Sequence, residues 1–308
     1  LLASSAASDV YKRQALLILT YVAFEYSYDD MHSRQDRIFR VEARFYENGE
    51  LTDDWASSSA GYATAMKQNM SAVEDYTRVG SQYYPEQVVK YNELLYRETG
   101  IGYAEANFFD FFDFKLLKGN KESCLDGPNK VVITERIARK YFKGADPIGK
   151  ILIFRSNIGE EACEVTGIME DMPINTHIRY NLLISYKTLP KWMDEYWYRH
   201  EVYSYVLLKS ANLKTQVEED FPVMAEKYKT EEALKNKTWA IQLTNLRDIH
   251  LNPQKAYEPE VKGNRSSIWV LICTALAILC IAWINYINMT VALSLIHISE
   301  PTRRSYIS

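Results

Sequence analysis

The side chains best suited to chemistry stand in two short polar stretches. Asp29 and His32 are three positions apart, and Asp171 and His177 flank Pro173. A carboxylate beside an imidazole could in principle hold a metal ion. The five histidines of the chain lack metal-ligand spacing, however. We therefore expect the first pair to lie in a solvated junction between a helix and a strand. The second pair should bond to the backbone of a turn.

Other patterns give no catalytic constellation. The chain has no HExxH, no glycine-rich phosphate loop and no Gly-x-Ser-x-Gly. The acidic cluster at residues 218–220 is typical of a solvated helix face. Asn285 and Asn288 could mark a polar pathway or a hydrogen-bonded contact between helices. We expect no catalytic, cofactor-binding or metal-ligating residues and no enzymatic activity. A membrane-tethered hydrolase would need a nucleophile and a base that we do not find.

Composition limits the class of protein further. The chain has 308 residues, 25% of them charged, and a net charge of −4. A pI near 5.9 argues against nucleic-acid binding, which needs a basic face. A mean hydropathy of −0.29 is typical of a soluble body that carries a small membrane portion. Cys273 and Cys280 lie in an apolar run. Cys124 and Cys163 are left as a possible disulfide pair, and the sequence does not decide whether they form the bond.

The elements that would position these groups begin with one long apolar run at residues 268–289. No acidic or basic residue occurs between Arg265 and Glu300. Trp269 and Tyr286 stand about 26 Å apart along a helix, close to a hydrocarbon thickness of roughly 30 Å. The pattern predicts a transmembrane helix; a buried core helix is the alternative.

The two ends of the chain differ from the sequence beside them. Residues 15–24 are apolar but too short to span a bilayer, which predicts a truncated membrane helix or the apolar region of a signal peptide. Residues 1–14 and 295–308 resemble translated sequencing adapters, although a basic tail at residues 303–304 is an alternative to the second. We therefore expect a fragment, cut at both ends inside a longer membrane protein.

Strand and helix signals alternate between the two apolar stretches. Asn48-Gly49 predicts a tight hairpin. Thr134 should cap a short helix at residues 135–142, which Gly144 and Pro147 stop. We expect aromatic residues 107–119 to form packed core. Strands are also expected on both sides of Asn92 and at residues 129–134, 148–154, 163–169, 181–185, 203–209 and 239–243, with helices at 57–70, 187–198 and 213–228.

This order is α+β in class. The outer pieces, at residues 38–104 and 201–262, predict one β-α-β subdomain. Residues 105–200 predict a second, mostly β subdomain inserted into it. The predicted membrane helices at residues 15–28 and 266–293 flank the whole.

Several stretches together resemble the FtsX-like permease family with its MacB-like periplasmic core domain, in the form found in Bacteroides-type bacteria. The most specific is Ile-Ala-Arg-Lys-Tyr-Phe-Lys-Gly-Ala-Asp-Pro-Ile-Gly-Lys at residues 137–150. The others follow the family's order, at residues 24–32, 36–40, 165–173, 176–177 and 285–290.

The resemblance implies an ABC transporter permease of the inner membrane, multi-pass, with the large loop in the periplasm. It implies a cytoplasmic ATPase partner of the MacB or LolD type, a permease dimer and contact with membrane lipid. A periplasmic membrane-fusion or substrate partner is a further implied contact. In such permeases ATP-driven motion serves export or mechanotransmission. The alternative from another class is the periplasmic sensor ectodomain of a two-helix receptor.

Overall fold

The protein divides into two units in the computed structural model. The structure describes residues 2–80, 86–156, 159–194, 196–197, 199–229, 236–259 and 262–304. The first unit is Leu1–Tyr28 with Lys262–Ser308, and the second is Asp29–Val261. Each unit is described by itself below.

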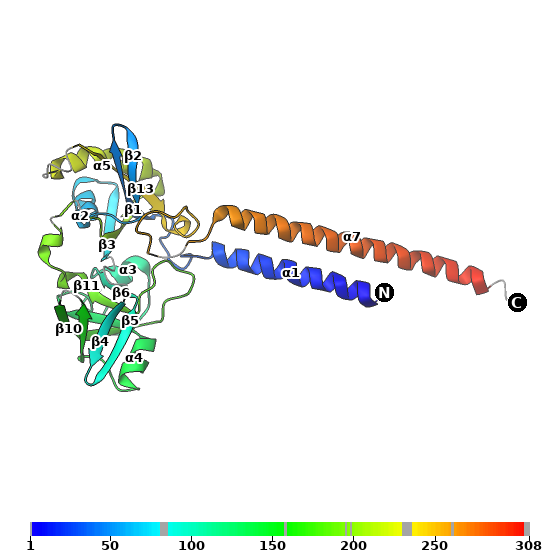
Figure 1. The fold of residues 1–308 in the computed structure, drawn as a ribbon, viewed down its shortest axis with the longest axis horizontal. Coiled ribbons are helices and arrows are strands. Elements are labelled where there is room, and N and C mark those ends of the chain that lie inside the picture. The colour runs from blue at the N-terminus through cyan, green and yellow to red at the C-terminus, as the bar shows by residue number, and fades with distance from the viewer. Residues whose placement is uncertain are drawn as a thin grey trace. The chain divides into compact units, whose positions relative to one another are not determined.

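The first unit consists of two helices, α1 (Leu2–Tyr26) and α7 (Arg265–Arg304), which run side by side (Figure 1). Their contact buries Ala15 and Val22 of α1, and Ile268, Ala275 and Ala282 of α7. These positions repeat every seven residues on each helix. A seven-residue spacing keeps one seam of a helix against its neighbour, and small residues let the two backbones approach closely.

One helix among the described residues is long and apolar enough to cross a membrane. It covers Arg265–Ala292, has a mean hydropathy of 2.5, and buries only 17% of its most apolar window within the protein. A core helix would be mostly buried, so low burial fits an apolar surface that needs a non-aqueous surrounding. The membrane assignments of residues 15–28 and 266–293 stay predictions.

The second unit is built on one continuous sheet. Its order is β13-β1-β12-β3-β6-β11-β8-β10-β9-β4-β5, and β2 and β7 pair with β1 and β10. Pairing is antiparallel except for β6 with β11 and β8 with β10. The strands are β1 (Ile38–Glu47), β2 (Glu50–Trp55), β3 (Val73–Gly80), β4 (Glu86–Tyr91), β5 (Leu94–Thr99), β6 (Ile101–Ala104), β7 (Leu116–Lys118), β8 (Lys130–Thr134), β9 (Ile151–Ser156), β10 (Gly159–Met169), β11 (Leu182–Ser185), β12 (Val202–Leu208) and β13 (Thr238–Asn245).

Four α-helices lie in the described part of this unit. They are α2 (Ala60–Asn69), α3 (Phe108–Phe112), α4 (Glu135–Phe142) and α5 (Lys214–Ala225). Helices α2 and α5 bury Tyr62 and Phe221 around Trp239 of β13, while α4 packs Tyr141 and Phe142 on the strands at the other end of the sheet (Figure 1). The mixed helices and sheet confirm the predicted α+β class.

Local signals placed most elements correctly. Asn48 and Gly49 have φ values of 52° and 84°, which joins β1 to β2 by the predicted hairpin. Thr134 accepts a hydrogen bond from the Ile137 N–H and caps α4, as predicted. The phenylalanines of the aromatic stretch are buried, which confirms its prediction as core.

The helix predicted at residues 187–198 is wrong. The described part of that stretch holds short 3-10 helices at Tyr186–Thr188 and Lys191–Asp194. Pro190 lies between them and disfavours helical geometry at the residue before it. Trp197 then stacks on Tyr228 with ring centroids 4.1 Å apart, so a tertiary contact replaces a regular helix.

The sheet also bears on the predicted subdomains. Strands β4, β5 and β6, which we assigned to the outer piece, lie in the sheet beside β9 and β11 of the predicted insert. Asp29–Val261 forms one compact unit. The division into two subdomains stays a prediction.

Cys124 and Cys163 are both free and buried. Cys124 belongs to the apolar cluster that contains the phenylalanines of α3, and Cys163 to the cluster beneath α4. Burial raises the pKa of Cys124 to about 11 and that of Cys163 to about 12. Since the thiolate is the reactive form, both side chains should be inert in the folded protein.

We expect Cys124 and Cys163 to react with iodoacetamide at pH 7.5 at least ~100-fold more slowly than an unshielded thiol. Ser123→Cys, at the exposed position next to Cys124, is the matched control and should react at the ordinary rate. Peptide mass spectrometry of the native and urea-unfolded chain gives the rates. Comparable labelling at positions 123 and 124 in the native protein would contradict the burial of Cys124.

Candidate functional site

The most unusual side chain of the second unit is Asp29, which is fully buried and has a positive φ of 59°. Its backbone N–H donates to the Asn175 carbonyl at 3.0 Å. Its Oδ1 accepts from the Thr176 hydroxyl at 2.5 Å and from the His177 N–H at 3.3 Å. Residues 175–177 therefore form hydrogen bonds with both the backbone and the side chain of Asp29.

The contact continues through the His177 ring to β12. His177 Nδ1 lies 2.7 Å from Asp29 Oδ2, and Nε2 lies 2.9 Å from the Tyr205 hydroxyl. This arrangement suits a ring whose Nδ1–H donates to the carboxylate and whose Nε2 accepts from the hydroxyl. Asp29, His177 and Tyr205 thus join three segments that are far apart in the chain; we call them, with Thr176, the Asp29 cluster.

Burial and charge oppose each other at Asp29. Burial alone would raise the pKa of this carboxyl, but its interactions with the His177 ring and the hydrogen bond from the Thr176 hydroxyl outweigh burial. The pKa of Asp29 consequently lies well below its usual range, and the group is a buried carboxylate. Burial also raises the pKa of Tyr205 well above its usual value.

His32 supports the cluster from the other side. Its Nδ1 bonds the Phe112 carbonyl, which can only accept, so Nδ1 carries a proton. Its Nε2 is 3.7 Å from Asp29 Oδ1 and has no hydrogen-bond partner in the described part of the chain. Ser33 then donates twice to Asp113 Oδ2, at 2.7 and 2.8 Å. The segment that begins at Asp29 is thereby fastened to the end of α3.

A second buried ionic group lies around Arg40 of β1. Its guanidinium forms a two-bond fork with Glu258, at 2.6 and 3.1 Å, and two bonds to Glu42 Oε1, at 2.6 and 3.0 Å. Lys255 reaches Glu42 Oε2 at 2.8 Å and Asp54 at 2.6 Å. We call these five residues the Arg40 cluster. It holds residues 255–258 against β1 and β2.

Opposite charges set the ionisation of the Arg40 cluster. Burial would lower the pKa of Arg40, yet Glu42 and Glu258 raise it above its ordinary value. Burial would likewise raise the pKa of Glu42, but Arg40 and Lys255 hold it below its usual range. The side chains of Arg40, Glu42 and Glu258 are at most 2% exposed, so each depends on its partners for compensation.

The geometry favours anchoring over catalysis. An Asp–His–hydroxyl series is the order of a nucleophile triad. Here, however, the hydroxyl belongs to Tyr205, which is 3% exposed and has a raised pKa. Along the chain, Asp29 comes three residues after the end of α1 at Tyr26, and Glu258 comes seven residues before α7 begins at Arg265. Each end of the second unit is therefore held by a buried charge.

Sequence reasoning misjudged these groups. The solvated junction predicted for Asp29 and His32 is wrong, because they are 0% and 1% exposed. The predicted hydrogen bond from His177 to the backbone of a turn is also wrong, because the His177 ring bonds two side chains, those of Asp29 and Tyr205. Asp171 does accept from a backbone N–H, that of Arg136, at 3.2 Å.

The remaining candidates stay apart from both clusters. Glu218, at the start of the predicted solvated acidic face, accepts from the Leu243 N–H at 2.7 Å. Asn285 and Asn288 are exposed on α7. Tyr205 and the Arg40–Glu258 pair were missed. Tyr205 and Arg40 are polar residues inside strand-like sequence, which is a weak signal, and Glu258 lies in a polar segment that gives no signal.

Comparisons with known proteins agree with this fold. The model of the MacB-like periplasmic core domain matches residues 15–222. A domain of a putative permease protein from Porphyromonas gingivalis is 23% identical, with a TM-score of 0.62 over 75% of this chain and 96% of that domain. It shows that the two share a fold. No curated protein matches the sequence.

Two further solved structures are more distant. The extracellular domain of the noncanonic ABC-type transporter YknZ from Gram-positive bacteria is 16% identical, with a TM-score of 0.45 over 67% of this chain and all of that domain. The periplasmic region of MacB from Actinobacillus actinomycetemcomitans is 15% identical, with a TM-score of 0.43 over 65% of this chain and 87% of that region.

Removal of the Asp29 carboxylate should destabilise the second unit. Asp29→Ala leaves Thr176 and His177 without their acceptor, and we expect a loss of about 3 kcal/mol in the free energy of unfolding. Asp30→Ala is the neighbouring control: Asp30 pairs at the surface with Arg247, so its loss should cost less than about 1 kcal/mol. Urea unfolding followed by tryptophan fluorescence measures both.

The pH dependence gives a second readout of the same group. Because the pKa of Asp29 is lower in the folded than in the unfolded protein, its contribution is complete above the unfolded pKa of about 4 and is lost as the pH falls below it. The wild type should therefore lose more stability than Asp29→Ala between pH 5 and pH 3. Parallel pH profiles would contradict a buried, stabilising carboxylate.

Proposed function

The chain belongs to the family of MacB-like periplasmic core domains of ABC-type permeases, and from that premise we propose that it couples a separate cytoplasmic ATPase to movement in the periplasm. In this proposal the residues before and after the second unit cross the inner membrane, and residues 29–261 form the moving periplasmic part. The permease works as a dimer, for export or for mechanotransmission. The family is one of transporter permeases and not a typical enzyme family.

The observation that carries the proposal is the anchoring of both ends of the second unit. Asp29 and Glu258 are the charged residues held at these ends, close along the chain to α1 and α7. In this proposal a displacement of either helix is passed along the chain to these two residues. A flexible, solvated linker would absorb such a displacement, whereas a buried salt bridge resists it because an unpaired buried charge costs about 3–5 kcal/mol.

The periplasmic location leads to a labelling prediction. With Cys273 and Cys280 replaced by serine, Ser123→Cys in the intact permease should react with a membrane-impermeant maleimide in whole cells. Glu122→Cys, exposed at the neighbouring position, should behave in the same way. Protection of both positions until the cells are lysed would contradict the proposed orientation.

Coupling leads to a prediction about motion. We expect ATP and its hydrolysis to change the distance between spin labels at Ser123→Cys in the two protomers of the intact permease, reconstituted with its ATPase. Glu258→Gln removes the charge that Arg40 holds and should abolish most of that change, with basal ATPase activity retained. Pulsed electron resonance measures the distance distribution.

Asp30→Asn serves as the matched control, because Asp30 lies next to an anchor but pairs at the surface. It should leave the ATP-dependent distance change intact. If the Glu258→Gln variant shows the same ATP-dependent distance change as the wild type, the salt bridge between Arg40 and Glu258 has no part in coupling. If the wild type shows no response to ATP, or if a kinase module follows this domain in the intact gene, the permease proposal fails.

A further inference from the structure

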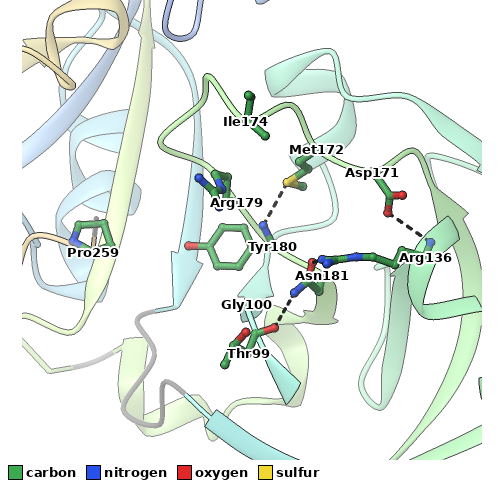
Figure 2. A pocket seen from close by; sticks show the side chains of 10 residues that line it. All are labelled: Thr99, Gly100, Arg136, Asp171, Met172, Ile174, Arg179, Tyr180, Asn181 and Pro259. Atoms are coloured by element: carbon green, nitrogen blue, oxygen red, sulfur yellow. Dashed lines mark hydrogen bonds between the residues drawn. The ribbon is translucent and has the colours of Figure 1, made fainter. Parts of the chain in front are cut away.

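A pocket of about 610 Å³ opens in the second unit. Such a volume is that of a small-molecule site. It is lined by the end of β5, the start of α4, the connection between β10 and β11, and one residue of the segment before α7 (Figure 2). The lining residues used below are Arg136, Arg179, Tyr180, Asn181, Ile174 and Pro259.

From this lining we propose that the pocket binds a small amphipathic anion, an organic phosphate or carboxylate with an apolar portion. The charge of the lining supports an anion. Arg136 and Arg179 bring two guanidinium groups, and guanidinium matches the planar or tetrahedral oxygens of such groups. Among the described lining residues the one carboxylate, that of Asp171, is already engaged by the Arg136 N–H at 3.2 Å and by Arg139 at 3.6 Å.

The Arg136 side chain is held in place before any ligand arrives. Its Nη2 donates to Asn181 Oδ1 at 2.5 Å, which uses one of five N–H donors. Asn181 is itself fixed, since its Nδ2 donates to the Thr99 carbonyl at 2.8 Å and its backbone N–H to Gly100 at 2.6 Å. A side chain fixed in this way loses little conformational entropy on binding.

The apolar part of the ligand has its own surface. Ile174 is 68% exposed at the pocket, and Pro259 lies across the pocket from Asp171 (Figure 2). The Tyr180 ring is packed onto β6 so closely that a Cβ on Gly102 would stand 2.6 Å from it. An apolar chain that covers Ile174 would gain from burial in proportion to its length.

The position of the pocket gives binding a consequence. Ile174 is the residue before Asn175, which accepts from the Asp29 N–H, and Pro259 is the residue after Glu258. A ligand that contacts both therefore touches the neighbours of both anchors. Binding itself does not depend on the proposed coupling and is tested separately from it.

The test is isothermal titration calorimetry of the purified full chain in a non-ionic detergent. The probes are hexyl phosphate, inorganic phosphate and hexyltrimethylammonium. We expect hexyl phosphate to bind at least about tenfold more tightly than inorganic phosphate, and the cation not to bind. The absence of hexyl phosphate binding by the wild type, or equal binding of anion and cation, would overturn the proposal without any variant.

Variants then assign the residues. Arg136→Gln and Arg179→Gln should each weaken hexyl phosphate binding by about tenfold or more, because a charge-assisted hydrogen bond is lost. Arg136→Lys keeps the charge but loses the paired donors of the guanidinium, so its affinity for hexyl phosphate should lie between those of the wild type and Arg136→Gln. Arg155→Gln, an exposed arginine of β9 paired with Glu160, is the matched control and should bind as the wild type does. An equal loss in Arg155→Gln would mean that binding follows overall charge, and the site would be wrong.

The source of the anion is decided in lipid nanodiscs. If anionic phosphatidylglycerol suppresses hexyl phosphate binding relative to phosphatidylcholine alone, the headgroup of a lipid occupies the pocket. If binding is equal in the two lipids, the ligand is a soluble anion. Either result retains the anion site, whereas loss of binding in both lipids would overturn it.

Discussion

The structure of the second unit depends on the need to compensate a carboxylate that has no access to water. Asp29 is fully buried and ionised, and removal of one partner from such a group leaves an uncompensated charge. Its partners come from the segment before β11 and, through the ring of His177, from β12. One charge thus fixes where the chain enters the sheet. Arg40 does the same for the segment that leaves it, since its fork on Glu258 can form in only one orientation.

The features predicted correctly from the sequence are the local ones. A hairpin at Asn48-Gly49, a cap at Thr134 and a buried aromatic stretch each follow from residues within one turn or one strand of each other. The order of these elements was enough to indicate an α+β class. Resemblance over several stretches added the family, which no single pattern of hydrophobicity could have supplied.

The features that were missed are long-range pairings. Asp29 and His177 are separated by 148 positions, and Arg40 and Glu258 by 218, so no window of sequence contains both partners. Without knowledge of its distant partner, a charged residue is assigned to the surface, because most charged residues are exposed. The helix predicted at residues 187–198 failed for a similar reason: its aromatic residues follow contacts with α2 and Tyr228, not a helical period.

The buried contacts of Asp29 and of Arg40 with Glu258 differ from apolar contacts in their dependence on direction. An apolar contact of the same size would hold the segments with equal or greater stability, but apolar contacts have little directional preference and allow sliding. A carboxylate that accepts three hydrogen bonds, or a guanidinium fork on a carboxylate, loses most of its energy after a displacement of about 1 Å, because hydrogen bonds weaken steeply with distance and angle. Such a joint is stiff at small displacements. The segment 171–181 carries Thr176 and His177, which hold Asp29, and most of the pocket lining. A ligand in the proposed site would therefore contact the same segment that holds Asp29.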